Sequence, residues 1–199
     1  MKRAFDVVAA SLGLAMTSPL IVAAAIAVKL ESNGPAFYSG PRVGRDGRVF
    51  KIHKLRTMRA GADTAGPAVT AADDVRVTAL GRWLRRTKAD ELPQLLNVVK
   101  GEMSLVGPRP EHPDFVRHYT PEQRRLLSVR PGLTGPTALA YLDEEEALRG
   151  GDSEAVYVRD VLPRKLAADL DYVETASFSG DLRILGRTGL ALLARPFRR

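Results

Sequence analysis

Apolar residues fill the first part of the chain without interruption. From Val7 to Val28 there are 22 residues and no charge, enough for a helix of about 33 Å that would cross a bilayer. Three interpretations compete: a secretory signal peptide, a single-pass membrane helix, and a re-entrant segment that enters and leaves by the same face. Asp6 and the mid-segment Pro19 disfavour the signal peptide.

The flanking charges favour the re-entrant interpretation. Lys2-Arg3 precede the apolar run and a basic cluster follows it, so both flanks prefer the cytoplasmic side. The proline of Ser18-Pro19 has no N–H, and its ring clashes with the carbonyl of Ala15, so we expect the helix to bend sharply there. Hydroxyls of Thr17 and Ser18 can satisfy the carbonyls that the break frees. A kinked helix that spans the membrane is left as the alternative.

Beyond this segment the pattern changes from strand-like to helical. Residues 36–59 alternate, with Ala36–Ser39 and Val49–Ile52 flanking Gly44–Gly47, which predicts a β-hairpin. Residues 60–73 are small and poorly periodic, and are expected to form a loop. The fold class is therefore α+β and mostly helical, with residues 1–32 in the membrane segment and 33–199 in one globular unit.

Helical periodicity and capping residues predict the remaining elements. Short helices are expected over 77–87 and from Asp90 to Lys100, the second ending at Gly101. Thr120-Pro121 opens another helix, with the threonine as its cap. Apolar residues then recur with helical spacing over 154–175. Leucines mixed with arginines over Ile184–Arg199 suit an amphipathic helix at the membrane interface.

The charge of the chain is positive and unevenly placed. Lys and Arg total 30 against 23 Asp and Glu, and seven basic residues but one acid lie between Pro41 and Arg59. Such a cluster prefers phosphates, whether of nucleic acid, lipid or nucleotide. The absence of cysteine excludes disulfides and thiolate metal sites. Aromatic residues are only 6%, which leaves few stacking platforms for nucleic acid.

The candidate chemistry lies where Asp90 and Glu91 open a helix. Taken alone, such acids usually cap the helix and complement its dipole. Arginines and a lysine crowd the preceding turns, however, and the two prolines around Arg109 hold one guanidinium in place. Carboxylates among fixed cations can hold Mg²⁺ with a diphosphate, or attack phosphorus directly.

Residues 90–110 (DELPQLLNVVKGEMSLVGPRP) resemble the signature of the bacterial sugar transferases, the monotopic phosphoglycosyl transferases. Other matching features follow in the same order along nearly the whole chain. They are KRAFD at 2–6, Ser18-Pro19, FKIHKLRTM at 50–58, DVRVT at 74–78 and RPGLTG at 130–135.

The resemblance implies a function, a site and a location. Asp90 would attack the phosphorus that bears the sugar of a nucleotide sugar, and polyprenol phosphate would then displace the aspartate. Glu91 would be the partner in the dyad, and Mg²⁺ would be required, held by Asp90 and Glu91. Phosphate and substrate binding would fall to cations in the matching segments. These are Lys54, Arg56, Arg85, Arg109 and Arg130.

The expected reaction transfers a sugar 1-phosphate from a UDP-sugar to undecaprenyl phosphate, and so starts exopolysaccharide, O-antigen, capsule or glycoprotein glycan assembly. The expected location is the cytoplasmic face of the bacterial plasma membrane. Membrane lipid is an expected partner and nucleic acid is not; a homodimer is left open. Two other classes compete with the enzyme: a membrane-tethered nucleic-acid-binding protein, and a structural subunit in which Asp90 serves only as a cap.

One departure from the family pattern concerns the sugar. After Thr134-Gly135 many relatives continue with an aromatic residue and an Asn-Gly-Arg-like segment, whereas this chain reads PTALAYLDEEE. The acidic run Asp143–Glu146 is expected either as a solvated helix face or as part of a different sugar pocket. The chemistry is unaffected, but the identity of the sugar is not fixed by the sequence.

Overall fold

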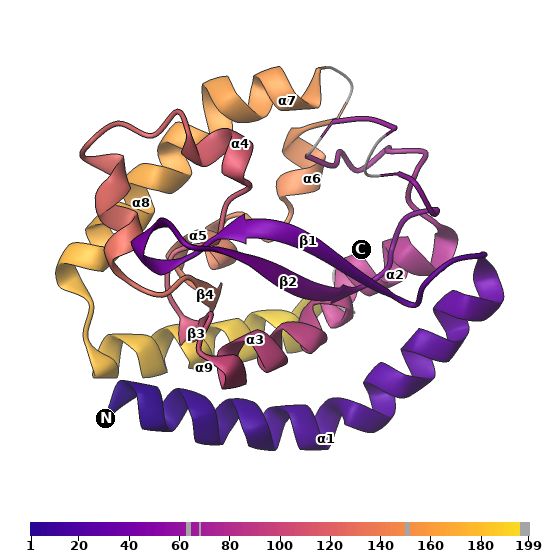
Figure 1. The fold of residues 1–199 in the computed structure, drawn as a ribbon, viewed down its shortest axis with the longest axis horizontal. Coiled ribbons are helices and arrows are strands. Elements are labelled where there is room, and N and C mark those ends of the chain that lie inside the picture. The colour runs from indigo at the N-terminus through magenta and orange to yellow at the C-terminus, as the bar shows by residue number, and fades with distance from the viewer. Residues whose placement is uncertain (63–64, 68, 150–151, 196–199) are drawn as a thin grey trace.

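The computed structural model describes residues 1–62, 65–67, 69–149 and 152–195 and shows a mostly helical α+β fold (Figure 1). The longer helices are α1 (Lys2–Glu31), α2 (Ala79–Thr87), α8 (Leu162–Thr175) and α9 (Phe178–Ala194). The shorter ones are α3 (Leu95–Lys100), α4 (Pro113–Val116), α5 (Pro136–Ala140), α6 (Glu144–Ala147) and α7 (Ser153–Val156). Single turns are η1 (Arg45–Gly47), η2 (Ala89–Gln94), η3 (Gln123–Ser128) and the π-helical η4 (Tyr157–Val161). The strands are β1 (Phe37–Val43), β2 (Val49–Leu55), β3 (Ser104–Val106) and β4 (Gly132–Thr134).

The predicted β-hairpin is confirmed and is longer than expected. Strands β1 and β2 pair antiparallel from Phe37 opposite Leu55 to Val43 opposite Val49. Asp46 closes the turn with a φ of 58°, a left-handed conformation that Asp tolerates better than most residues. The hairpin crosses the middle of the molecule (Figure 1), so residues of β2 are available to the elements on either side.

Helix α1 is one continuous helix of 30 residues with Pro19 inside it, rather than two separate half-helices. It bends midway and curves along one side of the molecule (Figure 1). The Ser18 hydroxyl donates to the carbonyl of Ala15 at 2.8 Å, and Thr17 donates to Gly13 at 2.7 Å. The carbonyl that Pro19 deprives of its N–H partner is therefore satisfied as predicted, and the helix bends without breaking.

The N-terminal end of α1 is fastened to the rest of the chain by charged side chains. Asp6 is 3% exposed and accepts from the Ser104 hydroxyl at 2.8 Å and from the main-chain N–H of Leu105 at 3.2 Å. Arg3 donates to the carbonyls of Val98 and Val99 in the last turn of α3, at 2.7 and 3.0 Å. These contacts hold the first turns of α1 against α3 and β3.

The C-terminal end of α1 is held by Arg56 and by a hydrogen bond from the Leu80 N–H to Glu31 Oε1 at 2.8 Å. The Arg56 guanidinium is 6% exposed and donates to the carbonyls of Asn33 at 2.5 Å and Ser32 at 2.8 Å. Orphan carbonyls at a helix end attract a cation in this way. Both ends of the bent helix therefore contact the same body.

The outer side of α1 is apolar and exposed. The helix is long and apolar enough to cross a membrane, and only 11% of its most apolar window of 18 residues is buried. The core helix of a soluble domain would have this surface covered by other elements. The exposed residues include Val8, Leu12, Met16, Leu20, Val22, Ile26 and Leu30.

Strands β3 and β4 form a short parallel pair that the pattern did not predict. Their backbones approach so closely that only glycine fits at the crossing: a Cβ on Gly107 would lie 2.6 Å from the carbonyl oxygen of Arg130. The Gly107 N–H donates to Thr134 at 3.0 Å, and Gly132 donates to the carbonyl of Pro108 at 2.8 Å. The crossing fixes the start of the Pro108–Pro110 segment.

The predicted helix over 90–100 divides in two. Residues 89–94 form the 3₁₀ turn η2, and α3 begins only at Leu95. It ends at Lys100 and is followed by Gly101, whose φ of 89° is as expected for a C-terminal glycine. Asp90 is not the cap: Lys88 precedes the turn with a φ of 58°. The expectation of Asp90 as a helix cap is therefore wrong.

The other predicted helices are present with shifted bounds. Helix α2 begins at Ala79 with Thr78 as its cap, and the predicted Thr120 cap exchanges two hydrogen bonds with Gln123 in front of η3. Elements α7, η4 and α8 follow one another over the predicted 154–175. The helix expected over 184–199 begins earlier than predicted, as α9. Its last four expected residues, and three of the predicted loop 60–73, lie outside the described residues.

Gly107→Ala should destabilise the protein by about 1–3 kcal/mol, because the added methyl forces the two backbones apart. Gly186→Ala is the matched control, since a Cβ there meets nothing within 4 Å and α9 gains a better helix former. Thermal unfolding in detergent checks both. Equal melting temperatures for the two variants would contradict the close approach.

Candidate active site

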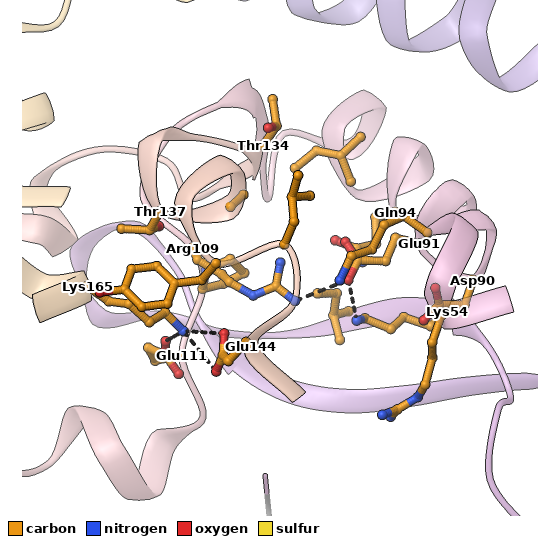
Figure 2. A pocket seen from close by; sticks show the side chains of 18 of the residues that line it. Lys54, Asp90, Glu91, Gln94, Arg109, Glu111, Thr134, Thr137, Glu144 and Lys165 are labelled. Carbon is orange, nitrogen blue, oxygen red and sulfur yellow. Dashed lines mark hydrogen bonds and ion pairs between the residues drawn. The ribbon is translucent and has the colours of Figure 1, made fainter. Parts of the chain in front are cut away.

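A cavity of about 380 Å³ lies beside η2, bordered by β2, the segment after β3, α6 and α9 (Figure 2). Four of the cations that line it come from different parts of the chain. These are Lys54 on β2, Arg85 on α2, Lys88 before η2, and Arg109 after β3. Leu133, Leu185, Gly189 and Leu192 contribute an apolar side. The cavity therefore combines a phosphate-like environment with an apolar wall.

Glu91 is the residue that draws the polar side together. Its Oε1 accepts from Lys54 Nζ at 2.9 Å and from Arg109 Nη2 at 3.1 Å (Figure 2). Burial by itself would raise the pKa of Glu91, but Lys54, Arg109 and Lys88 hold it well below its usual range. Glu91 is therefore a fixed negative charge that orients two cations.

Asp90 lies next to this network but is not tied into it. The side chain is 4% exposed, and its Oδ1 has no hydrogen-bond partner among the described residues. Burial raises the pKa of Asp90, while Lys54 opposes the shift. The environment thus separates the two neighbouring acids, one held ionised by cations and one left more basic. Asp90 lines the cavity, and a basic carboxylate with an unpartnered oxygen is suited to act as a nucleophile.

Arg109 is held from both of its ends. Its main-chain N–H donates to Asp169 Oδ2 at 3.2 Å, and the other oxygen of Asp169 accepts from Thr137 at 2.9 Å. Its guanidinium pairs with Glu91, which raises the pKa of Arg109 further. The prediction of a fixed guanidinium is confirmed, and part of the fork still faces the cavity (Figure 2).

The acidic run is divided between the cavity and the solvent. Glu144 and Glu145 line the cavity, where Glu145 accepts from Arg85 Nη1 at 2.9 Å and Glu144 accepts from Lys165 Nζ at 3.2 Å. Asp143 and Glu146 are exposed and pair with Arg195 and Arg149. The expectation that the run belongs to the pocket therefore agrees with the structure for Glu144 and Glu145, and the expectation of a solvated face agrees for the other two.

A buried lysine network forms the end of the cavity away from Asp90. Lys165 is 3% exposed and donates to Glu111 at 3.2 Å and to the Tyr157 hydroxyl at 3.0 Å. Tyr157 in turn donates to Glu111 at 2.7 Å. The sequence pattern did not indicate Lys165, Tyr157 or Glu111 as site residues. The available signal was that Lys165 and Asp169 occupy positions of the 154–175 helix where the spacing calls for apolar residues.

Two of the predicted substrate-binding cations lie elsewhere. Arg56 caps the end of α1, and Arg130 donates from its Nε to the carbonyl of Gly101 at 2.9 Å. Lys88, which was not among the cations predicted to bind substrate, lines the cavity instead. Its ammonium group forms no hydrogen bond or ion pair with a described residue. Burial lowers the pKa of Lys88, and Glu91 opposes the shift. Ser18 and Pro19 lie in α1 and do not line the cavity.

The fit to a magnesium ion rests on Asp90 and Glu91 alone. The described residues contain no group of three or more His, Asp or Glu side chains arranged to hold a metal. Mg²⁺ commonly binds through one or two carboxylates together with substrate phosphates and water. The unpartnered oxygen of Asp90 and the adjacent Glu91 meet that requirement once a diphosphate is present.

The buried carboxyl group of Asp169 predicts how the stability of the protein depends on pH. Burial raises its pKa to about 6, so the folded protein holds this proton more tightly than the unfolded chain does. Its contribution to stability is complete below about pH 4 and is lost as the pH rises through about 6. Asp169→Asn imitates the protonated form. The free energy of unfolding of Asp169→Asn, relative to that of the wild type, should therefore increase from pH 4 to pH 7, by up to about 3 kcal/mol.

Denaturant unfolding in detergent at several pH values measures this difference. Asp171→Asn, at an exposed position of the same helix, provides the baseline. A difference between Asp169→Asn and wild type that does not change with pH would contradict the shifted pKa.

Comparison with known proteins agrees with the geometry of the site. The family model described as bacterial sugar transferase matches residues 1–195. The UDP-glucose:undecaprenyl-phosphate glucose-1-phosphate transferase of Caulobacter vibrioides is 46% identical over 96% of this chain and 69% of its own length. The exopolysaccharide production protein PSS of Rhizobium leguminosarum is 36% identical over 98% of this chain and 96% of its own.

Other relatives are much longer than this chain. The UDP-N-acetylgalactosamine-undecaprenyl-phosphate N-acetylgalactosaminephosphotransferase of Aeromonas hydrophila is 41% identical over 68% of this chain, which spans only 33% of that relative. The two relatives named for a sugar differ in it, glucose in one and N-acetylgalactosamine in the other, and both are named transferases. With the family model matching residues 1–195, this chain is a transferase that belongs to the bacterial sugar transferase family.

Proposed function

We propose that the protein transfers a sugar 1-phosphate from a UDP-sugar to undecaprenyl phosphate through an aspartyl phosphosugar on Asp90. The observation that carries the proposal is Asp90 itself: it lines the cavity with Lys54, Arg85, Lys88 and Arg109, and its buried Oδ1 has no hydrogen-bond partner among the described residues. Relatives named for undecaprenyl-phosphate transfer support the choice of acceptor and donor. The product would start the assembly of an extracellular polysaccharide.

In the first step Asp90 Oδ1 forms a bond to the phosphorus that bears the sugar. The bond from that phosphorus to the bridging oxygen breaks, its electron pair stays on the oxygen, and UMP leaves. No general base is needed, because a carboxylate is already ionised at neutral pH. The cations of the cavity offset the negative charge of the diphosphate, and Glu91 holds Lys54 and Arg109 in position.

In the second step a phosphate oxygen of the lipid carrier attacks the same phosphorus. The bond to Asp90 breaks, the carboxylate is regenerated, and the polyprenol diphosphate sugar is released. The apolar side of the cavity, with Leu185 and Leu192 of α9, supports binding of a long hydrocarbon chain next to the charged site. Leu182, Leu190 and Leu193 are exposed on the same helix and suit contact with lipid.

Magnesium is part of this proposal. Asp90 and Glu91 would hold the ion together with the diphosphate, and the ion would supply charge neutralisation to the leaving group when bound.

The proposed membrane arrangement is monotopic, with both termini at the cytoplasmic face. Its support is that both ends of the bent α1 contact the same body, through Asp6 and Arg3 at one end and Arg56 at the other. A helix that spans the bilayer would place its two ends about 30 Å apart on opposite sides.

Asp90→Asn should abolish turnover while the protein still folds, because Asn is nearly the same size but is a far weaker nucleophile. UMP release from UDP-glucose and UDP-N-acetylgalactosamine, with undecaprenyl phosphate present, measures turnover. Wild type denatured after incubation with sugar-labelled donor and no lipid should retain the label, and Asp90→Asn should not. Asp160→Asn, an exposed acid paired with Arg159, is the control and should behave as wild type.

If Asp90→Asn kept more than a few per cent of the wild-type activity, Asp90 would not be the nucleophile. Label on Asp90→Asn equal to that on wild type would place the covalent adduct elsewhere.

Pro19→Ala should straighten α1 and move the N-terminus across the membrane. The substitution restores the N–H and relieves the clash with Ala15, and a straight helix of 30 residues is about 45 Å long. The C-terminal end of α1 continues into β1, so the N-terminal contacts are the ones that must break. A single cysteine at the exposed position 4 reports this through a membrane-impermeant thiol reagent in intact spheroplasts.

Ala4→Cys alone should stay unlabelled until the membrane is opened, and should be labelled in intact cells when combined with Pro19→Ala. Val75→Cys, on an exposed part of the body, controls for leakage and should stay protected in both backgrounds. The chain has no other cysteine. Labelling of Ala4→Cys from outside without Pro19→Ala would show that α1 spans the membrane.

A further inference from the structure

Gln94 is a buried side chain whose amide nitrogen is unused. It is 2% exposed, and its Nε2 has no hydrogen-bond partner among the described residues. A buried N–H without a partner is destabilising, and native proteins nearly always pair it. Gln94 lines the same cavity as the dyad and lies close to Glu91 (Figure 2). An unused donor on a residue that lines the cavity suggests that a ligand supplies the missing acceptor.

The unused donor lies four residues along the chain from an unused acceptor. Four side-chain atoms are buried without a partner in the described part of the chain, on Arg56, Asp90, Gln94 and Arg195. Only the atoms of Asp90 and Gln94 belong to residues that line the cavity. Both residues belong to η2. The turn thus presents one acceptor and one donor, each without a protein partner, to the same space.

We propose that Gln94 Nε2 donates a hydrogen bond to a non-bridging oxygen of the phosphoryl group that Asp90 receives and passes on. When Asp90 Oδ1 bonds to phosphorus, the phosphoryl oxygens are held beside the same turn, and one of them satisfies the amide. The bond can form in both half-reactions, because the same phosphoryl group takes part in each. This proposal rests on the function proposed above and adds a substrate-binding residue to it.

A neutral donor suits this position better than another cation would. The dyad places two carboxyl groups in the same turn, and Glu91 already orients Lys54 and Arg109. A further cation here would pair with Asp90 and lower its basicity, whereas an amide can contact the phosphoryl oxygen without neutralising the nucleophile. A glutamate would instead repel the phosphate.

Gln94→Met and Gln94→Glu test the role, since both keep the length of the side chain. The methionine variant should melt at or above the wild-type temperature, because it removes an unpaired polar group. Its kcat for UMP release should fall roughly tenfold to a hundredfold, with a smaller change in KM, as expected for a hydrogen bond to a charged group. Gln94→Glu should lose more activity than Gln94→Met.

The labelled adduct formed without lipid should appear more slowly in Gln94→Met, in the same proportion as UMP release. An unchanged kcat would overturn the proposal. A lower melting temperature together with lost activity would overturn it as well, because Gln94 would then be a packing residue. Asp90→Asn is measured in parallel with UDP-glucose and UDP-N-acetylgalactosamine. Wild-type UMP release that does not depend on Asp90 would reject the proposed function itself, a result distinct from either outcome at Gln94.

Discussion

The carboxylate of Glu91 is the interaction on which the rest of the site depends. One oxygen accepts from both Lys54 and Arg109, and so joins the hairpin, η2 and the segment after β3. Lys54, Arg109 and Glu91 are partly buried charges, and removing one leaves its partners unpaired where solvent compensates less than at the surface. The arrangement also bears on which acid is free. Glu91 engages Lys54 and Arg109, and Asp90 keeps an oxygen without a partner among the described residues.

Local sequence signals predicted the elements that local physics determines. The hairpin turn around Asp46, the Thr120 cap and the glycine stop at 101 depend on neighbouring residues and were found. The parallel pairing of β3 with β4 was not, since each strand has three residues and their contact depends on glycines far apart in the chain. Likewise, the local sequence does not show whether a proline breaks a helix or only bends it. In α1 the helix continues through Pro19, and the Ser18 hydroxyl satisfies the freed carbonyl of Ala15.

Charge type was easier to predict than the direction in which each side chain points. The basic cluster of 42–59 is divided by the hairpin: Lys54 lines the cavity, while Arg56 turns to the end of α1. Alternation along a strand would place Lys54 and Arg56 on the same face, because they are two residues apart. They separate because β2 ends at Leu55 and Arg56 lies beyond the strand. Lys165 and Asp169 gave a clearer signal, because charges within an apolar helical stripe must be paired when buried. Their partners Glu111 and Arg109 come from a segment that no spacing rule connects to that helix.

Helix α1 and the candidate active site are joined at α3. Arg3 binds the last carbonyls of α3, and the preceding turn η2 carries the dyad. On the other side, Asp6 holds the backbone of β3 just before the glycine crossing that positions Arg109. Helix α1 therefore packs against the elements that carry the site rather than standing apart from them. A displacement of the N-terminal turns of α1 would pass to both Asp90 and Arg109 through these contacts.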